Sequence, residues 1–98
     1  MIKNIKLLNI INMNVILVYD VNSKRVNKVM KICRKYLIRV QNSVFEGYIT
    51  EANLKRLKKE IYDKINPKQD SICIYKLESL KYVSKEEIGS IKQIENII

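Results

Sequence analysis

The chain has 98 residues, of which 47% are hydrophobic, and it carries a formal net charge of +9 and no histidine. This length predicts one domain, and the low glycine and proline content argues against a disordered tail. The composition excludes a histidine base or histidine-ligated metal, and no glycine-rich phosphate loop or zinc-binding spacing is present.

Residues 1–12 are predicted to form a loosely ordered amino-terminal extension, because asparagines interrupt their apolar run. The same segment is too polar to span a bilayer, so we expect no membrane partner. Residues 13–98 are expected to form the single domain. Cys33 and Cys73 are too few for a disulfide framework and predict reduced core thiols in a cytoplasmic protein.

The first strong signal is the almost fully apolar run from Asn14 to Asp20. A continuous run of this length is typical of a strand buried on both faces, and its β-branched and aromatic residues favour that state. Asp20 then lies at the carboxyl end of the strand. A lone aspartate in such a place is more often a cap or turn residue than a metal ligand.

A helix is expected next, capped by Asn22 or Ser23. Its buried stripe is predicted from residues that recur at helical spacing, namely Val26, Met30, Cys33 and Leu37. A concentrated set of basic residues occupies this part of the chain without an acid between them: Lys24, Arg25, Lys28, Lys31, Arg34, Lys35 and Arg39. Lysines at this spacing repel one another. A solvated helix face is the simplest interpretation, but such a patch is also the electrostatic signature of a phosphate-binding surface, which we favour.

The pattern from Arg39 to Ile49 predicts a second strand, with Gly47 marking a bulge or a close backbone approach. Thr50 is expected to cap a second helix that ends at Asn66-Pro67. The remaining elements are predicted as a strand over 70–77, a short strand over 80–83, a polar turn over 84–90 and a terminal strand near 91–98. This order predicts an α+β ferredoxin-like sandwich of the βαββαβ type, with two helices on one face of the sheet.

A turn or capping role is expected for Asp63 and Asp70, which flank the end of the second helix and the start of the next strand. Among the acids, only Asp20 is expected to project from the end of a buried strand beside the basic patch. A carboxylate suits Mg²⁺, which takes oxygen ligands and keeps several waters. One carboxylate is a weak metal site by itself. A two-fold axis through this region would bring two Asp20 side chains together, so nuclease chemistry at Asp20 is a hypothesis that depends on a homodimer.

Several strings in the chain resemble those of the CRISPR-associated protein two family. They are VYDV, which contains Asp20, the basic helix with Arg25, RVQNSVFEG from Arg39 to Gly47, and SICIYKL from Ser71 to Leu77. The RVQ-x-SVFE string is the most specific of them. The resemblance covers residues 13–98, and Leu37 departs from it because family members often have glycine there. The first helix could therefore end differently in this chain.

The resemblance implies a ferredoxin-like homodimer that bridges dimers of the larger CRISPR integrase subunit during spacer acquisition. It also implies contact with duplex DNA, single-stranded RNA or both. Family members are described as Mg²⁺-dependent endonucleases, with Mn²⁺ as an alternative ion, and the resemblance makes Asp20 the catalytic and metal-binding residue.

Three alternatives stay open beside this interpretation. The chain could be a non-catalytic DNA-binding scaffold, or a ribonuclease toxin built on the same fold. It could also be an RNA-binding module that stacks bases on Tyr19 and Tyr75, although the glycine-aromatic pattern of such modules is missing.

Overall fold

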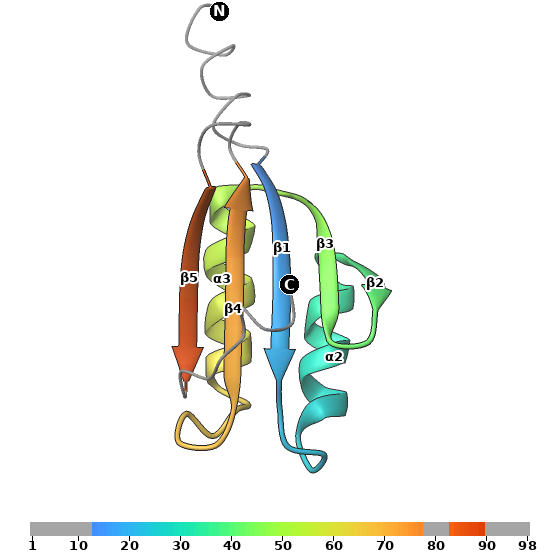
Figure 1. Cartoon of the computed structure of the whole chain (residues 1–98), viewed down its shortest axis with the longest axis vertical. Coiled ribbons are helices and arrows are strands. Elements are labelled where there is room, and N and C mark those ends of the chain that lie inside the picture. The colour runs from blue at the N-terminus through green and yellow to red at the C-terminus, as the bar shows by residue number, and fades with distance from the viewer. Residues whose placement is uncertain (1–12, 78–82, 90–98) are drawn as a thin grey trace, which may run out of the picture.

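The computed structural model describes residues 13–77 and 83–89, which form an antiparallel sheet with both helices on one face (Figure 1). The strands are β1 (Met13–Asp20), β2 (Ile38–Gln41), β3 (Val44–Ile49), β4 (Ser71–Leu77) and β5 (Val83–Gly89). The helices are α2 (Val26–Arg34) and α3 (Glu51–Tyr62). Along the chain the elements follow the βαββαβ order and are followed by β5, and in the sheet the strands lie in the order β2-β3-β1-β4-β5. The ferredoxin-like α+β sandwich is therefore confirmed.

β1 is the central strand, and it pairs with β3 on one side and with β4 on the other. Successive side chains of a strand point to opposite faces of the sheet. Val15, Leu17 and Tyr19 therefore join the core between the sheet and the helices. Ile16 and Val18 belong to a smaller apolar cluster on the opposite face, which we call the open face, together with Val44, Cys73 and Tyr75.

The first helix begins later than expected and without the predicted cap. The Asn22 side chain accepts a hydrogen bond from the Lys24 amide at 2.9 Å, and the Asn22 carbonyl accepts from the Arg25 and Val26 amides. Asn22 thus forms a turn of its own, a common alternative to capping for this residue type. Arg25 occupies the cap position with no side-chain cap bond. In α3, by contrast, the Thr50 hydroxyl accepts from the Asn53 amide at 3.1 Å, as predicted.

Residues 39–49 do not form one strand, so that prediction is wrong. β2 and β3 are the two arms of a hairpin, in which Gln41 pairs with Val44 and Asn42-Ser43 forms the turn. Ser43 has a φ of 66°, a left-handed value that hairpin turns often contain. After α2, Leu37 is buried, and a Cβ on Gly47 would lie 3.5 Å from Leu37 Cδ2. The residue that replaces the expected glycine thus packs beside a glycine of β3.

The predicted polar turn over 84–90 is also wrong, because β5 runs from Val83 to Gly89 and pairs with β4 along its length. Glu86 accepts a hydrogen bond from Lys58 Nζ of α3 at 2.7 Å and forms an ion pair with Lys76 of β4. These partners compensate the charge that made the segment look like a loop. Of the short strand expected over 80–83, only Val83 is described, and residues 1–12 and 91–98 also lie outside the described ranges.

Candidate functional site

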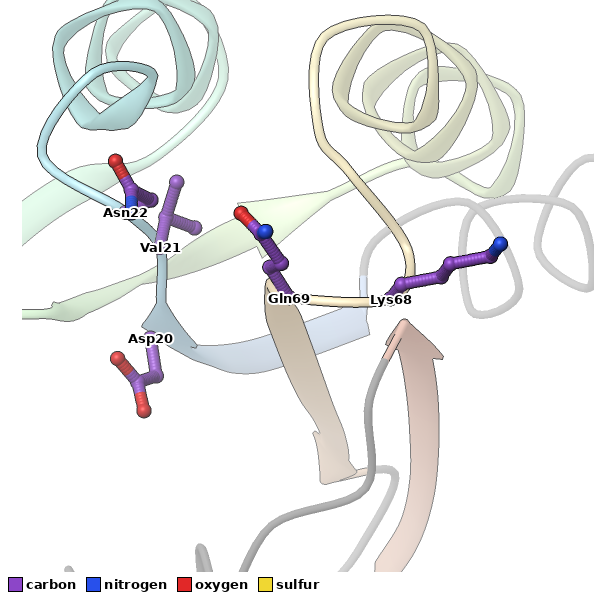
Figure 2. A pocket seen from close by; sticks show the side chains of 5 residues that line it. All are labelled: Asp20, Val21, Asn22, Lys68 and Gln69. Atoms are coloured by element: carbon purple, nitrogen blue, oxygen red, sulfur yellow. The ribbon is translucent and has the colours of Figure 1, made fainter.

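Asp20 ends β1 and is exposed. It pairs with Ser71 of β4 and follows Val18 on the open face, the side of the sheet away from the helices. Figure 2 shows its carboxylate on this side, whereas Val21 and Asn22 rise toward the helix layer. The sequence-based expectation that Asp20 projects from the end of a buried strand is therefore met.

A pocket of about 520 Å³ lies at this end of the molecule and is lined by Asp20, Val21, Asn22, Lys68 and Gln69. It brings the loop that follows β1 next to the turn between α3 and β4 (Figure 2). The lining holds one carboxylate, one ammonium group and two amides, so it is polar and mixed in charge. Such a lining suits a hydrated ion or a phosphate better than an apolar ligand.

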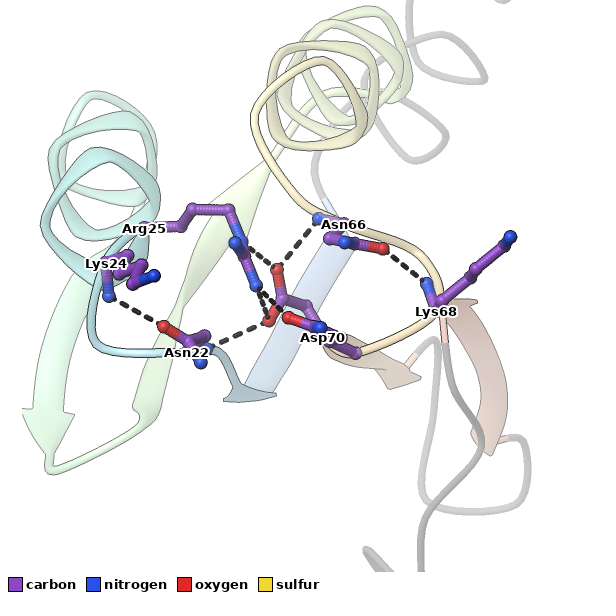
Figure 3. A network of polar contacts seen from close by, with 7 residues as sticks. Asn22, Lys24, Arg25, Asn66, Lys68 and Asp70 are labelled. Carbon is purple, nitrogen blue, oxygen red and sulfur yellow. Dashed lines mark hydrogen bonds and ion pairs between the residues drawn. The ribbon is translucent and has the colours of Figure 1, made fainter.

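Asp70 immediately precedes β4 and is 0% exposed. Its Oδ2 accepts from Arg25 Nε at 2.6 Å and from the Asn66 amide at 2.8 Å. Its Oδ1 accepts from the Asn22 amide at 2.9 Å and from Arg25 Nη2 at 3.1 Å (Figure 3). The hydrogen bond from Arg25 lowers the pKa of Asp70 from 3.8 to about 2, and the backbone amides act in the same direction.

This Asp70 network connects both chain segments that flank the pocket. The Asn22 amide follows Asp20 by two residues, and the Asn66 amide belongs to the turn after α3. The sequence suggested only a turn or capping role for Asp70. The two backbone hydrogen bonds fit that suggestion, but the ion pair with Arg25 spans 45 residues and has no local signal.

The basic residues chosen from the sequence lie in different settings. Lys24, Lys28, Lys31 and Arg34 are exposed, and no ion pair links their side chains to the residues that the structure describes. Lys35 pairs with Glu60 of α3, which also accepts a hydrogen bond from Tyr36. Arg39 donates to Asn42 Oδ1 at 2.8 Å. The guanidinium of Arg25 is directed to Asp70 and also donates to Gln69 Oε1 at 3.0 Å.

The second helix adds basic residues that the sequence analysis did not single out. Lys55, Arg56 and Lys59 of α3 are exposed. Because α2 and α3 contact each other and cover the same face of the sheet, their exposed cations belong to one side of the molecule (Figure 1). This helix-layer surface lies on the opposite side of the sheet from Asp20.

In the part of one chain that the structure describes, the donor set is too small for a metal centre. Within residues 13–77 and 83–89, no group of three or more Asp, Glu, Cys or His side chains could hold an ion. The exposed carboxylate of Asp20 suits a hydrated divalent cation, but it needs further ligands. Mg²⁺ therefore fits this site when a second chain, or the substrate phosphate, supplies them. Both cysteines are buried and neither is in a disulfide, and burial raises the pKa of the Cys33 thiol to about 12, which argues against Cys33 as a metal ligand.

The fold and the site together define a class of protein, namely ferredoxin-like α+β chains that have an aspartate at the end of the central strand and exposed cations on the helices. The family model for CRISPR associated protein Cas2 matches residues 13–85. The chain belongs to this family. In the described part of the chain, no helix has the length and apolar character needed to cross a membrane.

Relatives of known sequence and structure agree with this assignment. The "CRISPR-associated endoribonuclease Cas2" of Dictyoglomus turgidum is 49% identical over 77 residues, covering 79% of this chain and 88% of that protein. The protein of the same description from Thermotoga maritima is 45% identical over 86 residues, covering 88% and 99%. The structure described as "Crystal structure of cas2" has a TM-score of 0.67 and 38% identity, covering 84% of this chain and 92% of that one.

Proposed function

We propose that this chain forms a homodimer that binds nucleic acid and cleaves phosphodiester bonds of RNA with a divalent cation, Mg²⁺ or Mn²⁺, held between two Asp20 side chains. The position of Asp20 on the open face carries the proposal, because this face is not covered by α2 or α3. The relatives described as endoribonucleases support the choice of RNA.

The open face has the composition of a contact surface between two copies. Ile16 and Tyr75 are half-buried there around Val18 and Cys73, and Tyr48 is 73% exposed. Val18 and Cys73 are already buried within one chain, and two open faces related by a two-fold axis would bury Ile16, Tyr48 and Tyr75 as well and place the two Asp20 residues near one another. The dimer thus supplies the ligands that one chain lacks.

Each part of the site then has a chemical role. A bound divalent cation supplies charge neutralisation at the phosphoryl oxygens and acidifies water. Asp20 binds and orients that cation. The Asp70 network holds the backbone two residues after Asp20, and Lys68, across the pocket, offers a positive charge to the phosphate.

Asp20→Asn tests this activity, with Asp63→Asn as a matched control at an exposed aspartate on the end of α3. We expect Asp20→Asn to abolish Mg²⁺-dependent RNA cleavage while the dimer persists in sedimentation, and we expect Asp63→Asn to cleave normally. Cleavage by purified Asp20→Asn at the wild-type rate would refute the role of Asp20.

We also propose a second function, a scaffold that binds duplex DNA beside the larger integrase subunit during spacer acquisition, and a separate observation supports its DNA-binding part. The exposed cations of α2 and α3 lie on the helix side of the sheet, whereas Asp20 lies on the open face. A duplex bound along the helices would therefore be held away from the acid, and DNA binding would not need catalysis.

The scaffold role is tested by the salt dependence of duplex DNA binding. Each phosphate contact adds about 0.9 to the slope of log affinity against log salt concentration. Lys28→Gln with Lys31→Gln should therefore reduce the slope by about 1.8, whereas Lys64→Gln at the end of α3 should leave it unchanged. An unchanged slope in the double variant would contradict phosphate binding by α2. Co-purification of the integrase subunit with wild type and with Asp20→Asn would show whether bridging is independent of the acid.

A further inference from the structure

The hydroxyl of Ser71 is a buried polar group without a hydrogen-bond partner, the only side-chain atom of this kind among the described residues. Ser71 is 1% exposed. Buried polar groups are almost always hydrogen-bonded, because an unsatisfied one loses its water without compensation. The exception at Ser71 therefore calls for an explanation.

Ser71 occupies the position directly opposite Asp20 in the ladder between β1 and β4. Directly opposite residues of antiparallel strands have Cβ atoms about 4.5–5.5 Å apart and point to the same face. On the other side of Ser71, Gly89 is its ladder partner in β5 and has no side chain to offer. The carboxylate of Asp20 is thus the acceptor that the ladder places beside the Ser71 hydroxyl.

We propose that Ser71 is a positioning residue, whose hydroxyl donates a hydrogen bond to the Asp20 carboxylate when that carboxylate holds the divalent cation. The inference rests on the proposed cation site. A serine hydroxyl has one proton to donate, and an ionised carboxylate accepts several hydrogen bonds, so one Asp20 oxygen can face the ion while the other faces Ser71. Carboxylates that bind metals are commonly oriented by such a second hydrogen bond, whose loss costs about 10–100-fold in affinity.

A positioning role for Ser71 predicts a different effect of Ser71→Ala from that expected for a merely structural serine. Removing an unsatisfied buried hydroxyl leaves the folded chain as stable as before or more stable. Ser71→Ala should therefore keep or raise the melting temperature of the ion-free protein, and yet weaken the binding of the ion. A serine that only fills space would leave ion binding unchanged.

The experiment is a titration of the purified full-length chain with Mn²⁺, followed by calorimetry and by electron paramagnetic resonance. The variants are Ser71→Ala, Ser71→Thr, Asp20→Asn and the control Ser23→Ala, an exposed serine near the same pocket. We expect Ser71→Ala to bind Mn²⁺ at least about 10-fold more weakly. Ser71→Thr, which restores the hydroxyl, and Ser23→Ala should bind as wild type does.

Wild-type affinity in Ser71→Ala together with lost binding in Asp20→Asn would overturn the role of Ser71 and leave the proposed cation site intact. Equal Mn²⁺ binding by wild type and Asp20→Asn would overturn the cation site, and the role of Ser71 with it. A lower melting temperature of ion-free Ser71→Ala would also count against the proposal, because it would show that the hydroxyl is satisfied without the ion.

Discussion

Arg25 donates to both carboxylate oxygens of Asp70, and this bidentate ion pair joins the N-cap of α2 to the residue that precedes β4. Asp70 is fully buried, whereas the Arg25 side chain is 21% exposed. The same carboxylate accepts the backbone amides of Asn22 and Asn66. One buried acid therefore holds together the segments that surround Asp20.

Asp70→Asn should lower the free energy of unfolding by about 3 kcal/mol, since breaking a buried ion pair leaves an uncompensated charge. An asparagine also cannot accept all four hydrogen bonds. Urea denaturation at pH 7 measures the effect, and Asp63→Asn, at an exposed aspartate, should stay within about 0.5 kcal/mol of wild type. Equal stability of the two variants would show that the Asp70 network contributes nothing.

The Asp70 network also predicts how stability depends on pH. The pKa of Asp70 falls from 3.8 to about 2 on folding, so the unfolded chain takes up this proton first as the pH falls. The contribution of Asp70 is therefore complete above about pH 4 and is lost between about pH 4 and pH 2. The pKa shift corresponds to a contribution of about 2 kcal/mol to the free energy of unfolding. Because the Arg25 side chain is partly open to solvent, we expect about 1–2 kcal/mol.

The pH effect is measured as the stability difference between wild type and Asp70→Asn, because the other carboxyl groups cancel in this comparison. We expect the difference to shrink as the pH is lowered from 4 to 2. A difference that stayed constant over this range would mean that the pKa of Asp70 is not depressed.

Arg25 was predicted from the sequence to contact nucleic acid. Because its guanidinium binds Asp70, we expect a substitution at Arg25 to affect stability, and a substitution at Lys28 to affect DNA binding. Arg25→Lys keeps the positive charge but loses the planar fork that matches a carboxylate. We expect a lower unfolding midpoint with no change in the salt dependence of DNA binding. Lys28→Gln should reduce the salt dependence of DNA binding and leave the unfolding midpoint unchanged. A reduced salt dependence in Arg25→Lys, at unchanged stability, would instead show that Arg25 contacts the nucleic acid.

Gly89 should not tolerate a side chain. Its φ is +91°, and a Cβ there would lie 2.0 Å from the carbonyl oxygen of Asp70. Gly47 also has a positive φ, +155°, so backbone strain of about 1–3 kcal/mol is expected for a side chain at either glycine. Only at Gly89 does a steric clash with the backbone add to it. We expect Gly89→Ala to be clearly less stable in thermal denaturation than Gly47→Ala, whose Cβ would meet its nearest neighbour at 3.5 Å. The opposite order would contradict the close approach of β5 to Asp70.

The parts of the fold that could be predicted from the sequence are those with local signals. The apolar run before Asp20 indicated the central strand, and Thr50 indicated the start of α3, because the chemistry of each lies within a few residues. The strand β5 could not be predicted in this way, since Glu86 is compensated by Lys58, which is 28 residues away. The hairpin turn at Asn42-Ser43 did have a local signal in its turn-forming residues, although one strand was predicted across them.

The same distinction between local and distant signals holds for the residues of the candidate site. Asp20 could be recognised because a carboxylate at the end of an apolar run stands out in the sequence. Asp70 and Ser71 could not, because their roles come from partners that lie far away along the chain and only the ladder and the packing bring them together. The exposed cations of α3 were missed because the acids Glu51 and Glu60 flank them in the sequence, although the fold places them beside those of α2.

The most direct test of the central proposal is the stoichiometry of Mn²⁺ binding to the purified full-length chain, measured by calorimetry together with the mass of the complex in solution. A site shared by paired Asp20 residues predicts one ion per two chains, a dimeric mass, and loss of that ion in Asp20→Asn. One ion per chain on a monomer, retained in Asp20→Asn, would contradict it.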